Sequence, residues 1–138
     1  MENSGNLIEL KSIDRVFHLG DSEVHALRNI NLNIARGEYI AVMGPSGSGK
    51  STLLNLIGLL DKPDSGTYTL EGRDVTTLNP NEQAKVRSER VGFIFQSFHL
   101  VPRLTAAANI ELPLILAGIA PSERSKRVKQ ALNDYGLV

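Results

Sequence analysis

The beginning of the chain alternates apolar and polar side chains. Residues 7 to 11 alternate weakly, and residues 13 to 17 continue toward a turn at Gly20-Asp21-Ser22. Residues 24 to 27 are placed to return antiparallel, and Ile30, Leu32 and Ile34 then alternate with Asn31 and Asn33. A period of two is typical of strands that have one face in a core and the other in water. The pattern therefore predicts a layer of antiparallel strands at the start of the chain.

Two later segments are apolar without alternation. Glu38–Met43 and Val91–Phe95 each carry a short, continuous apolar run. Such runs are typical of strands that are buried on both faces of a parallel sheet. We therefore expect these two segments to be buried strands of an α/β core.

The remaining elements are predicted from helical spacing, caps and turn residues. Asn79-Pro80-Asn81-Glu82 combines a side-chain cap, a first-turn proline and a first-turn acid. Thr105 is a second cap candidate and Ser122 a third, the last before apolar positions spaced three, four and seven apart. The predicted elements are an apolar helix over 53–60 that begins near Lys50, a strand over 67–71, a helix to about Arg90, a helix bent at Pro113 toward Gly118, and a final amphipathic helix.

The strongest motif lies between the first apolar run and the first predicted helix. Gly44, four further residues and then Gly49-Lys50-Ser51 form the phosphate-loop pattern, and its flanks are the strand and helix that the pattern requires. Glycines let successive backbone N–H groups face one anion, and the helix start adds its dipole. Lys50 is placed to reach the β- and γ-phosphates, and Ser51 to ligate Mg²⁺. A Gly/Ser-rich linker would lack these flanks, so we predict a nucleotide phosphate site formed by Gly44, Pro45, Ser46, Gly47, Ser48, Gly49, Lys50, Ser51 and Thr52.

Composition narrows the class of protein. The chain has 138 residues, which suits at most one domain, and its fifteen basic and fifteen acidic residues cancel. That balance indicates neither nucleic acid nor an anionic membrane as a partner. No cysteine is present, so the chain has no disulfide framework. The longest apolar stretch, residues 110–120, is interrupted by Glu111 and Pro113 and is too short to span a bilayer. The first residues lack the build of a signal peptide, so we expect a cytoplasmic protein, peripheral to a membrane component at most.

Several motifs together form a pattern that runs nearly from end to end of the chain. They are Phe17 before the Gly20 turn, Ala26-Leu27, Gly37-Glu38, the phosphate loop, Gly58 with Leu60-Asp61, Gly66, Gly72, Gly92 to Gln96, and the run Leu100 to Thr105. With these motifs the chain resembles the nucleotide-binding domain of ABC transporters, and more narrowly the branch that powers macrolide export and lipoprotein release.

The resemblance implies a fold and an organisation. It implies an α/β fold, with an ABC-type P-loop NTPase core, an N-terminal antiparallel β layer, the start of a helical subdomain and an incomplete parallel sheet. On this basis residues 1–138 are the N-terminal part of one nucleotide-binding domain. About 1–95 would form the β layer and core, and about 96–138 the glutamine loop and the start of the helical subdomain.

The resemblance also implies roles for particular residues. Phe17 falls where the family stacks an aromatic ring on adenine, although the alternating pattern alone also allows a core phenylalanine. Gln96 falls where a glutamine approaches Mg²⁺ and the attacking water, although alone it would suit a solvated loop residue. Thr52 would donate to an α-phosphate. Lys50 and Gln96 are then the catalytic candidates, and Ser51 and Gln96 the metal candidates.

The implied cofactors are ATP and Mg²⁺. The implied partners are a membrane-spanning permease and a second copy of the domain, with no nucleic acid, on the inner face of the plasma membrane. His18, His25 and His99 have no metal-ligand spacing, and we expect them to be surface or packing residues.

The sequence departs from the family in two places. Ala108-Asn109 stands where this branch usually has Glu-Asn. The signature Leu-Ser-Gly-Gly-Gln loop, the strand ending in Asp-Glu and the switch histidine are missing, and Leu59-Leu60-Asp61 is a poor substitute because Lys62 follows it. We therefore expect a chain truncated within the helical subdomain, which alone neither hydrolyses ATP nor folds stably. In the family two later strands lie between Glu38–Met43 and Val91–Phe95, and without them each segment would expose an apolar edge.

Three other functions stay open at this point. One is an ABC-type ATPase of DNA repair or chromosome maintenance, although neither heptads nor cysteine pairs support the insertions of that class. Another is a non-catalytic nucleotide-binding module that a partner chain completes. The third is a small-molecule kinase, against which the strand-terminal Phe95-Gln96 argues.

Overall fold

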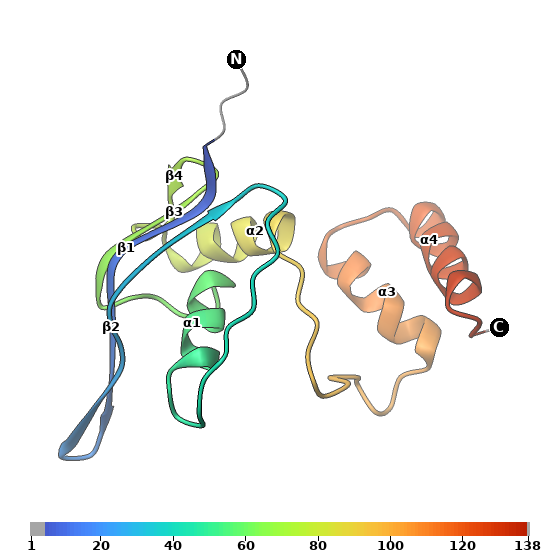
Figure 1. Cartoon of the computed structure of the whole chain (residues 1–138). Coiled ribbons are helices and arrows are strands. Elements are labelled where there is room, and N and C mark those ends of the chain that lie inside the picture. Colours follow the sequence, from blue (N-terminus) through green and yellow to red (C-terminus); the bar gives the residue numbers. More distant parts are fainter. Residues whose placement is uncertain (1–4, 138) are drawn as a thin grey trace. The chain divides into compact units, whose positions relative to one another are not determined.

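The structure is a computed structural model that describes residues 5–137, and it divides the chain into two compact units, Met1–Phe93 and Ile94–Val138 (Figure 1). The first unit contains an antiparallel sheet whose strands lie in the order β2-β1-β3-β4. The strands are β1 (Asn6–Leu19), β2 (Ser22–Ala35), β3 (Ser65–Leu70) and β4 (Arg73–Asp74). The helices of this unit are α1 (Lys50–Ile57) and α2 (Pro80–Arg90).

The predicted antiparallel layer is confirmed. β1 and β2 pair from Asn6 opposite Ala35 to Leu19 opposite Ser22, with several register shifts on the way. β3 crosses β1 closely at Gly66, where an added Cβ would lie 2.4 Å from the Ser12 carbonyl oxygen. Only glycine fits so near another backbone at this residue's positive φ of +91°.

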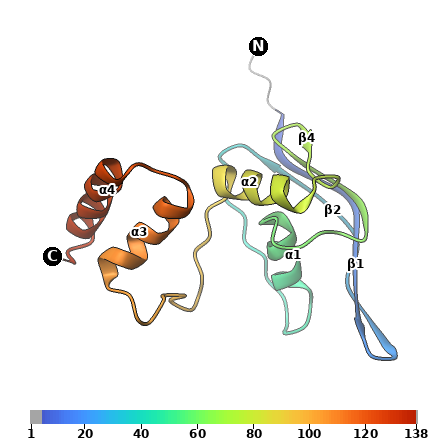
Figure 2. The same cartoon turned by 180° about the vertical axis from the view of Figure 1, so that it is seen from behind.

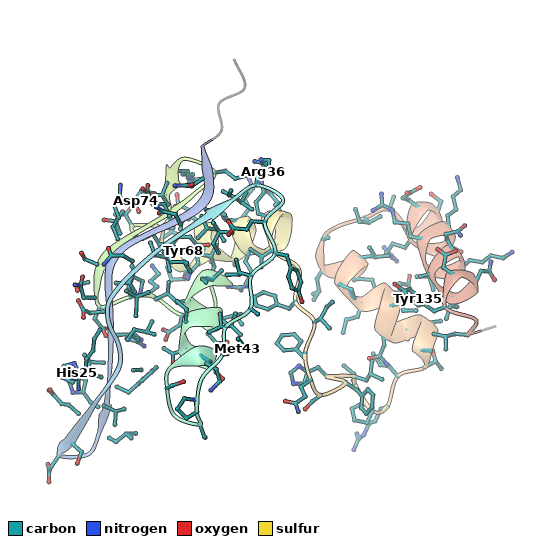
Figure 3. The ribbon with its side chains drawn as sticks, in the orientation of Figure 1. His25, Arg36, Met43, Tyr68, Asp74 and Tyr135 are labelled. Carbon is teal, nitrogen blue, oxygen red and sulfur yellow. The ribbon has the colours of Figure 1, made fainter. Side chains whose placement is uncertain are left out.

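Both helices of the first unit lie on the same side of the sheet in the two views (Figures 1 and 2). Between the sheet and α1 lies the core, in which Tyr68 is 2% exposed and Leu56 is fully buried (Figure 3). The Tyr68 hydroxyl donates a hydrogen bond of 2.8 Å to the Ile57 carbonyl at the end of α1, and burial raises its pKa to about 12. The buried core residues are Leu10, Ile13, Leu27, Leu56, Leu59, Tyr68, Leu70, Val75 and Leu78.

The predicted start of α2 is confirmed in detail. The Asn79 side chain accepts from the backbone N–H groups of Asn81 and Glu82, and the Glu82 carboxylate accepts in return from the Asn79 N–H. This reciprocal cap satisfies donors that the first turn of a helix leaves without partners. Arg87 then ties the helix to the core by donating to the Leu59 carbonyl at 2.7 Å.

The expectation that Glu38–Met43 and Val91–Phe95 are buried strands is wrong for this structure, whereas the expectation that both segments expose apolar surface is confirmed. Neither segment forms a strand, and Tyr39 and Met43 are 95% and 89% exposed. A parallel strand needs neighbours that accept and donate its backbone hydrogen bonds. Among residues 5–137 no strand pairs with either segment, so apolar runs that suit a sheet centre lie at the surface.

The second unit contains α3 (Ala106–Leu116) and α4 (Pro121–Asp134). Thr105 caps α3 as predicted, because its hydroxyl accepts from the Ala108 N–H at 3.2 Å. Ser122 does not cap α4: the N-cap is Ala120, two residues earlier, and the helix begins at Pro121, whose fixed φ suits a first helical position. No helix in the described part of the chain has the length and apolar character needed to cross a membrane.

We predict that Tyr68→Phe destabilises the fold by about 0.5–1.5 kcal/mol, because the Ile57 carbonyl loses its buried hydroxyl donor. Urea unfolding of a protein that contains these residues measures the change. Tyr135→Phe is the matched control, since Tyr135 is 80% exposed and should leave the free energy of unfolding unchanged. Equal stability of the wild type and Tyr68→Phe would show that this hydrogen bond contributes nothing net.

Candidate functional site

The glycine loop packs directly on β2. Gly49 has a φ of +87°, and a Cβ added there would lie 2.4 Å from the Ala26 carbonyl oxygen and 3.3 Å from a Leu27 methyl. Gly47 also has a positive φ, +78°, but it faces open space. The loop therefore needs glycine at residue 47 for its backbone angle alone, and at residue 49 for both the angle and the close approach.

A pocket of about 610 Å³ lies between this loop and the β1–β2 hairpin. The loop side supplies residues 46–52, and the hairpin side supplies Phe17, Val24 and Ala26. The structure thus brings Phe17 together with most of the predicted phosphate loop. Gly44 and Pro45 do not line the pocket, and they contribute their carbonyl groups to the loop's own hydrogen bonds instead.

Sequence reasoning missed the contribution of Val24 and Ala26. Both residues line the pocket from β2, and Val24 pairs with Phe17 across the hairpin. Val24 is 45% exposed although it is apolar. The cross-strand position of Phe17 was the signal that could have identified these residues as its neighbours.

The first turn of α1 presents hydrogen-bond donors to the pocket. Gly49 is the N-cap and has no side chain that could accept from the N–H groups of this turn, and the turn contains no acidic residue. Lys50, Ser51 and Thr52 open the helix and line the pocket. Free N–H groups and the positive end of the helix dipole together favour an anion at this position.

The Lys50 ammonium group lies across the loop. Its Nζ donates to the carbonyl oxygens of Gly44 at 2.8 Å and Pro45 at 2.6 Å, and lies 3.4 Å from Ser48 Oγ. These contacts keep a positive charge beside the N–H groups of the helix start. The loop therefore combines a compact cation with oriented backbone donors, which is the chemistry that binds phosphate.

The Phe17 ring contacts the side chain of Arg15, which lies two residues earlier on the same strand, β1. The Arg15 guanidinium carbon lies 4.6 Å from the centre of the Phe17 ring. Arg15 in turn donates two hydrogen bonds of 2.9 Å to Asp61 and one of 2.8 Å to Asp64. Partial burial alone would lower the pKa of Arg15, but the bonds to Asp61 and Asp64 outweigh it and raise that pKa.

The other candidates lie outside the pocket. Gln96 belongs to the second unit, so the geometry of the first unit does not include it. His18 lies 3.4 Å from Glu23, and the His99 ring packs 4.4 Å from that of Phe95. In the part of the chain that the structure describes, no three His, Cys, Asp or Glu side chains are grouped to hold a metal ion.

Known proteins are similar to this chain over most of its length. The family described as ABC transporter matches residues 27–138. An uncharacterized ABC transporter ATP-binding protein of Bacillus subtilis, YknY, is 47% identical over 131 residues, which are 95% of this chain and 57% of that protein. The macrolide export ATP-binding/permease protein MacB of Marinobacter nauticus is 50% identical over 131 residues, which are 95% of this chain and 20% of that protein.

A solved structure also matches. An ATP-binding cassette that was determined as a dimer in a post-hydrolysis state with ADP and Pi has a TM-score of 0.81 and 43% sequence identity to this chain. The match covers 91% of this chain and 56% of that one. The chain therefore spans little more than half the length of YknY and of this cassette.

We predict that Gly49→Ala lowers the melting temperature more than Gly47→Ala does. Both substitutions place a side chain at positive φ, which costs about 1–2 kcal/mol, but only the Gly49 methyl meets the Ala26 carbonyl. Thermal unfolding of the two variants beside the wild type measures the difference. Equal shifts for both variants would mean that the loop does not depend on its approach to β2.

Proposed function

The chain belongs to the ABC transporter family, and we propose that its glycine loop binds ATP with Mg²⁺ as the energy-coupling part of a transporter of the export or lipoprotein-release type. The observation that carries this proposal is one pocket with an uncapped helix start and Lys50 at one end and Phe17 at the other. A triphosphate would bind to the helix start and Lys50, and a base would bind to Phe17.

At the phosphate end, the loop offers donors and charge that need little rearrangement. The backbone N–H groups at the start of α1 are already oriented, and Gly47 and Gly49 hold the backbone in the left-handed region. Lys50 Nζ is bound to loop carbonyls in this structure, and a phosphate oxygen is a stronger partner for an ammonium than a neutral carbonyl. We propose that Lys50 turns from these carbonyls toward the β- and γ-phosphates, while Thr52 donates to the α-phosphate.

At the base end, the lining residues are Phe17, Val24 and Ala26, whose side chains have no hydrogen-bonding groups. Such a surface holds a base by stacking and burial, not by contacts to its polar edge. Phe17 is 37% exposed and thus accessible to a ring from the pocket side. We propose that this ring stacks on adenine.

The donor set of the pocket fits Mg²⁺. Ser51 is exposed and lines the pocket, so its hydroxyl is available as one hard oxygen ligand. Mg²⁺ usually takes only one or two protein oxygens and completes its shell with phosphate oxygens and waters. Bound there, the ion would neutralise phosphate charge. We propose Ser51 as the first ligand and Gln96 of the second unit as a contact to the ion and to the attacking water.

For partners, we propose a membrane-spanning permease and a second copy of the domain. The name of the similar MacB protein joins an ATP-binding part and a permease, and the similar cassette was solved as a dimer. The formal net charge of zero gives no support to a nucleic-acid partner. We propose that the protein lies in the cytoplasm on the inner face of the membrane, and that only the complete, dimerised domain hydrolyses ATP.

Lys50→Ala should weaken ATP binding by about 1.5–3 kcal/mol, because a charge-assisted contact to phosphate is lost. Titration calorimetry of ATP with Mg²⁺, on a folded protein that contains these residues, measures the loss. Lys126→Ala is the control, since Lys126 is exposed on α4 and distant in sequence from the loop. Equal ATP affinity for the wild type and Lys50→Ala would exclude the loop as the phosphate site.

Phe17→Ala should weaken ATP by on the order of 1 kcal/mol and leave pyrophosphate binding unchanged, because only a base can stack on the ring. Phe98→Ala, which removes a phenylalanine that is 92% exposed in the second unit, serves as the control. If the Phe17 variant loses ATP and pyrophosphate affinity in equal measure, the ring has a structural role and does not bind the base.

A further inference from the structure

We propose that Arg15 is a positioning residue for base binding: held by Asp61 and Asp64, its guanidinium fixes the Phe17 ring at the edge of the nucleotide pocket. This inference rests on the proposed function, since it assigns Arg15 a role in the same site. Among residues 5–137, Phe17 lines the pocket and Arg15 does not.

The contact between the two side chains is well formed. The guanidinium carbon lies 4.6 Å from the centre of the Phe17 ring, within the range in which a cation and an aromatic face attract each other. Phe17 is 37% exposed, so part of its ring remains open to a ligand. Because Arg15 does not border the pocket, it restrains the ring without competing for the surface that a base would use.

Arg15 can serve as a fixed point because its own side chain is immobilised. Nε and Nη2 donate to the two oxygens of Asp61, both at 2.9 Å, and Nη1 donates to Asp64 at 2.8 Å. A two-point bond to one carboxylate fixes the plane of a guanidinium as well as its position. The Arg15 side chain is only 21% exposed, so water weakens this network less than it weakens a surface pair.

The carboxylates are themselves tied to the backbone. The second oxygen of Asp64 accepts from the Val16 N–H at 2.7 Å, and the Asp64 N–H donates to the Asp14 carbonyl at 2.9 Å. Asp61 also accepts from the Lys62 N–H at 2.8 Å. These hydrogen bonds attach the segment after α1 to β1 at Asp14 and at Val16, the residue before Phe17.

This arrangement links the two ends of the pocket through one helix. The first turn of α1 carries the phosphate-binding groups, and the segment after its last turn carries Asp61 and Asp64. Arg15 then transmits the position of that segment to Phe17. Besides the direct approach of Gly49 to Ala26, the ion pairs of Arg15 thus connect the segment after α1 to the stacking ring.

The test compares Arg15→Met in two backgrounds, the wild type and Phe17→Ala, with ATP and pyrophosphate as ligands. We expect Arg15→Met to weaken ATP about two- to fivefold in the wild type, as the loss of one cation–aromatic contact predicts, and to leave pyrophosphate unchanged. In the Phe17→Ala background it should change neither ligand. Arg15→Lys keeps a cation but not the two-point bond, so its loss of ATP affinity should be smaller.

An arginine that contributes only to folding, and not to base binding, should not distinguish ATP from pyrophosphate. Arg124→Met is the matched control, because Arg124 is 20% exposed and paired with Glu111 in the second unit, and it should leave both affinities unchanged. The proposal is overturned if Arg15→Met weakens pyrophosphate as much as ATP, if it leaves ATP unchanged, or if it weakens ATP equally without Phe17. Should Arg15→Met fail to fold, Arg15→Lys decides by the same comparison of ATP with pyrophosphate.

The stacking role of Phe17 and the positioning role of Arg15 can be excluded separately. If Phe17→Ala does not distinguish ATP from pyrophosphate, the stacking role in the proposed function is wrong and the role of Arg15 falls with it. If Phe17→Ala distinguishes them but Arg15→Met does not, the base site stands and only the positioning role of Arg15 is excluded.

Discussion

The close approach of Gly49 to the Ala26 carbonyl determines where the helix α1 begins. No residue with a Cβ fits at that point, and the left-handed backbone angle excludes most other residues as well. From this contact the helix runs into the core, where Leu56 is completely buried, and its first turn is directed into the pocket beside the β1–β2 hairpin. The whole site therefore depends on one backbone-to-backbone contact between loop and sheet.

The features that could be predicted from the sequence are those with local causes. The alternation from residue 7 to residue 34 predicts the hairpin because each strand's pattern indicates which face is buried. Asn79 and Thr105 predict helix starts because each cap bonds to N–H groups two or three residues away. The glycine loop belongs to this class in its positive backbone angles, whereas the contact of Gly49 with Ala26 joins residues that are distant in the sequence.

Features that depend on distant partners were not predicted correctly. The apolar run at Glu38–Met43 indicates a buried strand, but a strand also needs paired neighbours, and in the described residues none pairs with it. The contribution of Val24 to the pocket depends on its register opposite Phe17, and the role of Arg15 depends on Asp61, which is far away in the sequence. Ser122 was a plausible cap, but with Pro121 as its first residue the helix has its cap two residues earlier, at Ala120.

The two ends of the pocket differ in the strength of the interactions they can offer. At the loop, an ammonium, oriented N–H groups and a helix dipole act together on an anion, and charge-assisted contacts contribute about 1.5–3 kcal/mol each. At the hairpin, Phe17 and Val24 offer stacking and burial, which contribute roughly 0.5–1.5 kcal/mol beyond the buried area. On the proposed assignment, the phosphates supply most of the affinity. The hairpin then mainly orients the nucleotide, and a weak contact can orient a ligand only if its own position is fixed. That requirement is why the bonds from Arg15 to Asp61 matter although they lie outside the pocket.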